Sequence, residues 1–303
     1  MNFKRIIPYL TIAIVTILLL VFIYSAYTVV KKETISAFNR QQMLVAKQTS
    51  KVIENFFERF KGELELLSSL DGISDLDING KAIMQKYYTN RSERIKAITR
   101  MDENGRIIFT VPSNRKIIGK DLSYQEHVKY VLKNHSPTVS DIFISVQEYE
   151  TIAFHMPVIK KGIFRGTIVI LIPFEHIIEK SIPFSSKKER YSCENTTIFT
   201  KKGNILATTC EKLKESNLKE SSLILLKEKI QDNKSGIVTY IIDSKSCPIK
   251  KSKYFCAYHS VKLENTYWVV VVMTSEKEIL VIMQEFKNKL YLAMSLCLLL
   301  VMG

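Results

Sequence analysis

The sequence lacks the short motifs that mark the common catalytic and metal sites. It has five cysteines but no C-x-x-C pair, and its five histidines form no H-E-x-x-H, so neither a metal site nor a cofactor is expected. G-x-S-x-G is absent as well, which leaves a triad of Ser145, His155 and Asp141 without support. We therefore predict no catalytic residues and no enzymatic activity in this chain.

Arginine-rich blocks are also missing. The net charge is +14, but lysines are scattered among glutamates along the chain, which is typical of a solvated surface that could lie near anionic lipid. Nucleic acid is not predicted as a partner.

Two segments, one near each end of the chain, contain no charged residue. Residues 6–30 are uncharged for longer than the roughly 20 residues that a membrane helix needs, and we predict a transmembrane helix after a cytoplasmic segment 1–5. A cleaved signal peptide is the alternative, although the apolar core of a signal peptide is shorter than residues 6–30. Residues 290–303 are interpreted as the start of a second membrane helix, with a C-terminal core helix as the alternative. The predicted location is the bacterial inner membrane.

Four cysteines lie between the two apolar ends, namely Cys193, Cys210, Cys247 and Cys256. Cys193 and Cys210 flank one hairpin pattern and Cys247 and Cys256 flank another, so each of these two pairs could form a disulfide. Disulfides require an oxidising compartment, which favours an extracytoplasmic location for residues 31–289. The alternative is four unpaired buried thiols.

After the first span, apolar residues recur at intervals of three, four and seven, which predicts one helical stripe. The stripe comprises Ile35, Phe38, Val45, Val52, Phe56, Phe60, Leu64 and Leu67. We expect residues 31–93 to form this long helix and a connection. The stripe could dock on its own domain or on a partner helix, and a homodimer through this helix and the membrane helices is expected.

Two similar blocks of strands follow, at residues 94–182 and 183–275. Asn104-Gly105 predicts a tight turn in a hairpin at 95–112, before a helix near 123–134 and strands at 138–146, 151–159 and 163–172. The second block has a hairpin at 196–208, a helix near 221–231, and strands at 236–242, 253–261 and 266–273. Ala153-Phe154-His155 resembles Ala257-Tyr258-His259 in the second block. Ser275 and Glu278 form a capping box that opens an exit helix at 276–289. The predicted fold class is α+β, with two stacked antiparallel-sheet units on one long helix.

These features resemble the double Cache domains, which are PAS-like extracellular sensors of bacterial transmembrane receptors such as histidine kinases. The likeness rests on the long helix, TRMDENGRIIFTVP, GKDLSYQEHVKYVLKNHSPTVSDIF and IAFHMPVIKKGIFRGTIVILI, and it covers residues 33–275. It implies a small-molecule pocket in the first unit. Relatives that bind amino acids have an arginine where Gln125 stands here, an aromatic residue in place of His127 and an aspartate near Leu171. An α-amino acid is therefore not predicted as the ligand.

The candidate ligand-binding residues share a position around the sheet face and helix of the first unit. They are Tyr124, Gln125, His127, Tyr130, Asp141, Phe143, Ser145 and His155. Their mixture of imidazole, hydroxyl and carboxyl groups suits a small polar ligand, although His259 repeats His155 and could indicate a shared structural role. We expect a receptor input module whose output, such as a kinase, a cyclic-dinucleotide enzyme or a chemoreceptor tail, is not contained in the chain. An anchored accessory or interaction protein is the alternative.

Overall fold

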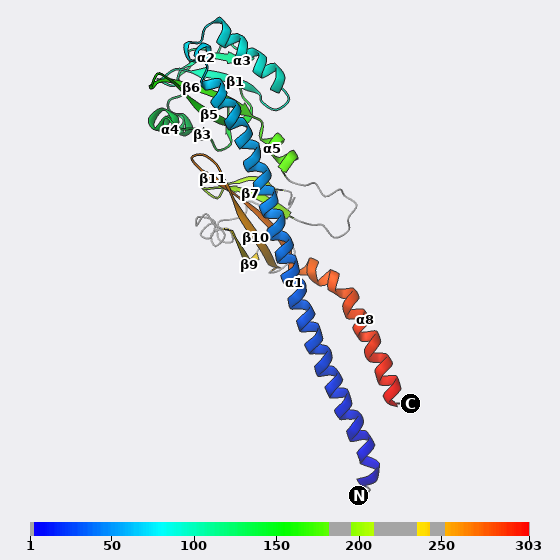
Figure 1. Cartoon of the computed structure of the whole chain (residues 1–303). Coiled ribbons are helices and arrows are strands. Elements are labelled where there is room, and N and C mark those ends of the chain that lie inside the picture. The colour runs from blue at the N-terminus through cyan, green and yellow to red at the C-terminus, as the bar shows by residue number, and fades with distance from the viewer. Residues whose placement is uncertain (1–2, 182–194, 209–234, 243–251, 303) are drawn as a thin grey trace.

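One helix runs through almost the whole molecule. In a computed structural model, which describes residues 3–181, 195–208, 235–242 and 252–302, α1 (Phe3–Ser68) has 66 residues. Residues 9–61 contain neither glycine nor proline, so the helix meets no breaker. Figure 1 shows it rising from the N-terminus to a cap of helices and strands at the top.

Two further helices form this tip, where the sequence had predicted only a connection. They are α2 (Asp71–Asp75) and α3 (Ile78–Arg91). The Asp77 side chain caps α3 by accepting a hydrogen bond from the backbone N–H of Gly80 at 2.7 Å. Glu63 of α1 holds α3 in place, since it accepts from the Tyr87 hydroxyl at 2.8 Å and from Arg91 Nη2 at 2.8 Å.

The sheet next to the tip, here called the distal unit, has antiparallel strands in the order β2-β1-β6-β5-β3, with β4 paired to β5. The strands are β1 (Ala97–Met101), β2 (Ile107–Val111), β3 (Thr138–Val139), β4 (Phe143–Ile144), β5 (Glu150–Lys160) and β6 (Ile163–Ile172). The unit also contains α4 (Glu126–Asn134) and α5 (Phe174–Ser181). The hairpin at 95–112 is confirmed. The single strand predicted at 138–146 is wrong, because a break between β3 and β4 divides it.

The second sheet, here called the proximal unit, lies further down α1 (Figure 1) and has the order β8-β7-β11-β10-β9. Its strands are β7 (Asn195–Thr200), β8 (Ile205–Thr208), β9 (Gly236–Ile242), β10 (Ser252–Lys262) and β11 (Tyr267–Ser275). The predicted helix near 221–231 lies outside the described residues. Two antiparallel sheets on one helix confirm the predicted α+β architecture.

The contact face of α1 is apolar against the distal unit. Ile53, Phe57, Phe60 and Leu64 are buried in one core cluster. Phe57 meets Phe154 of the distal sheet and Trp268 of the proximal sheet edge-on, with ring centroids 6.0 and 5.5 Å apart. Val52, which the predicted stripe included, is 42% exposed. The prediction failed at Val52 because adjacent helical positions there are both apolar and the pattern cannot separate them.

Against the proximal unit, the same face of α1 also carries polar residues beside the buried Ala46, and we call Asn39, Gln42, Thr49 and Ser50 the polar seam. The Gln42 amide lies 2.6 Å from Thr274 Oγ1, and the Ser50 hydroxyl donates to the carbonyl of His259 at 3.3 Å. Asn39 Oδ1 and Thr49 Oγ1 are buried and have no hydrogen-bond partner among the described residues. The apolar stripe predicted from the sequence did not include these positions because they are polar.

Two polar contacts connect the distal and proximal units away from α1. Asn265, in the turn between β10 and β11, accepts a hydrogen bond from the backbone N–H of Val139 in β3 at 2.7 Å. Lys202, in the turn between β7 and β8, pairs with Glu126 of α4 at 2.9 Å. Both turns of the proximal unit therefore reach elements of the distal unit.

The last helix, α8 (Glu276–Met302), continues directly from β11. The predicted capping box is present, because Glu278 N–H donates to Ser275 Oγ at 3.3 Å and Ser275 N–H donates to Glu278 Oε2 at 3.1 Å. Lys31 of α1 pairs with Glu276 at 3.0 Å. Below this pair, Ile279 and Met283 pack against Tyr27 and Val30, so the end of the predicted span also contacts protein.

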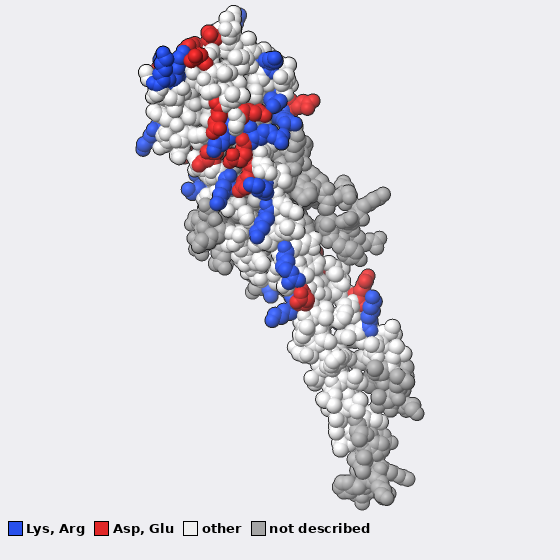
Figure 2. Space-filling view, in the orientation of Figure 1, with Lys and Arg blue, Asp and Glu red and all other residues white. Residues whose placement is uncertain are grey.

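The lower part of the molecule is apolar on its surface. Within the described residues, α1 is the one helix that is long and apolar enough to cross a membrane, with a mean hydropathy of 2.4 and no buried residue in its apolar window. Figure 2 shows lysine, arginine, aspartate and glutamate over the two units and the upper part of α1, while the described parts of the lower helices are mostly white in this view. The apolar segment is a candidate membrane span.

Candidate ligand-binding site

A cavity lies on the face of the distal sheet that points away from α1. Ala153, His155, Val169 and Leu171 form part of its sheet wall, and α4 with the segments before and after it provides the opposite wall. Alternate residues of β5 face opposite sides, which is why Phe154 packs on α1 while its neighbours line the cavity. The volume is about 40 Å³, enough for a few water molecules.

Two histidines meet in this cavity. His127, at the beginning of α4, and His155, in β5, have ring centroids 5.1 Å apart, and the His127 ring also lies 4.7 Å from that of Phe143. His155 is 1% exposed, and neither of its ring nitrogens has a hydrogen-bond partner among the described residues. A buried imidazole without partners costs free energy. A bound molecule could supply the missing partners.

Both imidazoles are uncharged at neutral pH. Burial lowers the pKa of His127 to about 4, opposed only weakly by nearby Glu126. Burial also lowers the pKa of His155 well below its usual range, and His127 adds to this shift. Each neutral ring offers one N–H donor and one acceptor nitrogen. The pair therefore provides hydrogen bonds without charge.

The structure brings together five of the eight predicted site residues. Gln125, His127, Phe143, Ser145 and His155 all line the cavity. Tyr124 is 65% exposed and Tyr130 is 39% exposed, and neither lines the cavity. Asp141 is half-buried beside it, where burial raises the pKa of its carboxyl group. Asp141 precedes β4 and does not share a continuous strand with Phe143 and Ser145, so the alternation assumed for these three residues does not apply.

Other cavity residues escaped the sequence analysis. Thr99 and Met101 come from β1, and Gln147 comes from the turn before β5. The alternation of β1 could have identified Thr99 and Met101, whereas no pattern indicates a turn residue such as Gln147. A serine–histidine pair does not form, because Ser145 Oγ accepts from the backbone N–H of Gln147 at 3.2 Å and the nitrogens of His155 are unpartnered. In the described part of the chain, no group of three or more metal-ligating side chains occurs.

The fold and this cavity can now be compared with known proteins. A family model described as Cache domain matches residues 26–281. The chain belongs to the Cache domain family. Cache domains are sensory input modules, and the resemblance to double Cache sensors in the sequence is confirmed. No curated protein sequence matches the chain.

Solved structures share the fold of this Cache domain. The ligand-binding domain of a Campylobacter jejuni chemoreceptor in complex with L-valine has a TM-score of 0.62 and 16% identity, over 82% of this chain and 97% of that one. A domain assigned to a sensory box/GGDEF family protein of Vibrio parahaemolyticus gives 0.59 and 14%, over 81% and 99%. An extracellular ligand binding receptor from Desulfohalobium retbaense gives 0.59 and 17%, over 77% and 40%, so this chain spans less than half of that structure.

The two similar tripeptides of the Cache domain face opposite ways. His155 lies opposite Val169, and both line the cavity on the side away from α1. His259 lies opposite Val270, which belongs to the core against α1. A shift of one residue in a strand exchanges its faces, so the sequence similarity does not give the two histidines the same environment.

Of the four cysteines predicted to form disulfides, the structure describes Cys256. It is buried in β10, opposite Met273 and Val238, and burial raises the pKa of its thiol. Cys193, Cys210 and Cys247 lie outside the described residues. The disulfides therefore stay a prediction.

The His127 site should make the Cache domain less stable in acid. The pKa is about 4 when folded and about 6.5 when unfolded, so the unfolded chain binds more protons and stability falls as the pH decreases through this window. We expect His127→Phe, which keeps a ring beside Phe143, to reduce the loss of unfolding free energy between about pH 7.5 and about pH 5 by about 2 kcal/mol. Urea titrations of the detergent-solubilised chain measure this. An unchanged pH dependence would contradict the burial of a neutral His127.

Proposed function

We propose that this chain is the ligand-sensing input of a transmembrane receptor, and that a small extracellular molecule binds in the distal cavity. The observation that carries the proposal is His155, which is fully buried, lines the cavity and has both ring nitrogens unpartnered within the described structure. Unpaired buried polar groups are uncommon because they lose their hydration without compensation. Gln125, His127 and Ser145 add polar groups around the same cavity.

A connected set of contacts supports transmission from this cavity towards the membrane. Thr138 of β3 lies directly opposite His155, and the next residue, Val139, donates to Asn265 in the turn that begins β11. β11 leads into α8 without a linker. A ligand that changes the position of β5 or β3 can therefore bias α8, by as much as its affinities for the two arrangements differ.

We place the apolar part of α1 in a bacterial inner membrane and both sheet units outside the cytoplasm. The exposed apolar window of α1 and the charged surface of the two units support this arrangement. We also propose a homodimer along α1, because Leu44 is 55% and Val52 42% exposed above the span. The output would be a kinase, a cyclic-dinucleotide enzyme or a chemoreceptor tail.

Thermal unfolding of the full chain in lipid nanodiscs tests the binding proposal. Panels of organic acids, amines, amides and nucleobases are added at millimolar concentration to the wild type and to His155→Leu. We expect at least one compound to raise the Tm of the wild type by mass action and to leave the variant unchanged. His259→Leu, outside the cavity, is the matched control and should retain the shift. A panel without effect, or with equal effects on the wild type and His155→Leu, would refute binding in this cavity.

A further inference from the structure

The distal cavity has an uncharged lining. None of the described residues that line it is a lysine, arginine, aspartate or glutamate. Glu126 acts electrostatically on His127, and Glu126, Asp141 and Lys202, none of which is among the lining residues, interact with one another. Lys202 is already paired with Glu126 at 2.9 Å. Among the described residues, the lining therefore offers no cation to an anionic ligand.

The polar groups of the lining include both hydrogen-bond donors and hydrogen-bond acceptors. His155 needs one partner for its N–H and one for its bare nitrogen, whichever tautomer is present. Gln125 adds an amide group; it is the N-cap residue of α4, but its side chain makes no capping hydrogen bond. A ligand that satisfies these groups must itself carry both a donor and an acceptor.

The rest of the cavity is apolar. Met101, Ile107, Val128, Val169 and Leu171 line it together with the polar groups. Burial of a charged group there without an opposite charge would cost several kcal/mol, whereas an alkyl or aromatic group would gain from leaving water. The lining thus combines a few polar groups with a larger number of apolar side chains.

We infer that the cavity binds a small uncharged molecule that combines a hydrogen-bond donor and acceptor with an apolar group, as in a primary carboxamide. The inference rests on the proposed function and specifies the ligand class of the same site. A zwitterionic amino acid would bring two unmatched charges into the lining and is therefore not expected to bind. A free carboxylate and a protonated amine are disfavoured for the same reason.

Matched compounds that differ in charge test the inference. Propionamide, propionate and propylamine share a short alkyl body, and nicotinamide and nicotinate share a ring. Binding to the full chain in nanodiscs is followed by thermal shift and saturation-transfer NMR at neutral pH. We expect the amides to bind at least tenfold more tightly than their charged counterparts and to lose binding in His155→Leu.

Gln125→Arg provides a gain-of-binding variant at the half-buried beginning of α4. It supplies the missing cation, so propionate or nicotinate should now bind at least as tightly as the corresponding amide. If a charged compound binds the wild type best and is lost in His155→Leu, the inference is wrong while the proposed function stands. If no compound of any charge binds the wild type, or if binding persists in His155→Leu, the proposed site itself is wrong.

Discussion

We expect Arg100→Met to destabilise the distal unit more than substitutions of exposed arginines do. Arg100 of β1 is 1% exposed, and burial lowers its pKa to about 10, so its guanidinium stays charged at neutral pH. In place of a carboxylate it donates to backbone carbonyls, including Ile73 at 3.1 Å and Arg165 at 2.6 Å. Further donations reach the carbonyls of Ser74, Met101 and Thr167.

Loss of this guanidinium leaves several buried carbonyls without partners, at a cost of at least about 3 kcal/mol. Urea unfolding of the full chain in detergent measures the change. Arg106→Met is the matched control, because Arg106 is 55% exposed and its ion pair with Asp121 spans 3.7 Å; its effect should stay below about 1 kcal/mol. Equal effects of the two substitutions would show that the carbonyls around Arg100 find other partners.

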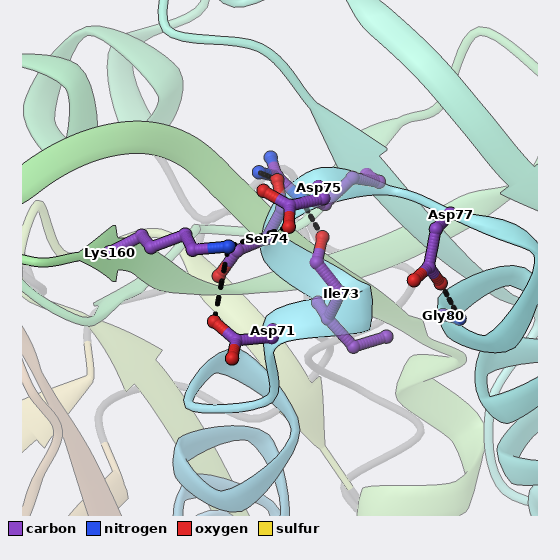
Figure 3. Close-up of polar contacts among 8 residues, drawn as sticks. Asp71, Ile73, Ser74, Asp75, Asp77, Gly80 and Lys160 are labelled. Atoms are coloured by element: carbon purple, nitrogen blue, oxygen red, sulfur yellow. Dashed lines mark hydrogen bonds and ion pairs between the residues drawn. The ribbon is translucent and has the colours of Figure 1, made fainter.

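Gly80→Ala should have an effect of similar size at the other side of the tip. α2 and α3 cross so closely that a Cβ atom on Gly80 would lie 1.9 Å from the carbonyl oxygen of Gly72 and 2.9 Å from the nitrogen of Ile73. Backbone atoms cannot yield as a flexible side chain can, so the two helices must separate. Figure 3 shows the hydrogen bond between Asp77 and Gly80 at this crossing, close to Ile73 and Ser74 of α2. We expect a loss of about 3 kcal/mol.

Gly62→Ala is the control for the intrinsic preference of alanine in a helix. Gly62 lies within α1, and nothing approaches within 4 Å of a Cβ added there, so the substitution should stabilise the chain by about 1 kcal/mol. Both variants are compared by urea unfolding under the same conditions. Stabilisation by Gly80→Ala would mean that α2 and α3 are not in contact at this glycine.

The sequence predicted those elements that have a local periodic signal. The long helix, the hairpin turning at Asn104-Gly105, the repeated sheets and the capping box of Ser275 and Glu278 are all found. Each depends on residues close in the chain, where helical or alternating spacing directly reflects the local geometry. The tip helices were missed because α2 is a single short turn and α3 has no marked apolar face.

The cavity was only partly predictable for a related reason. Gln125, His127 and His155 were selected from the helix and strand expected to form the site, and the structure places them together. Tyr124 and Tyr130 belong to the same segment but point elsewhere, since the orientation of a short helix is decided by long-range packing of Val128 and Val131. The environment of Arg100 depends on carbonyls from two distant segments, 73–74 and 165–167, which no sequence pattern reveals.

Because α1 is long and unbroken, a small tilt at one end of the helix displaces its other end by a larger distance. At about 1.5 Å per residue its 66 residues extend for about 100 Å, so a tilt of about 1° at the distal unit displaces the opposite end by roughly 2 Å. Tight apolar packing fixes α1 at Phe57, Phe60 and Leu64, whereas the polar seam holds it with hydrogen bonds and has spare acceptors at Asn39 and Thr49. A motion too small to disturb the cavity is thus magnified at the N-terminal end of α1, while the residues of the seam exchange hydrogen-bond partners.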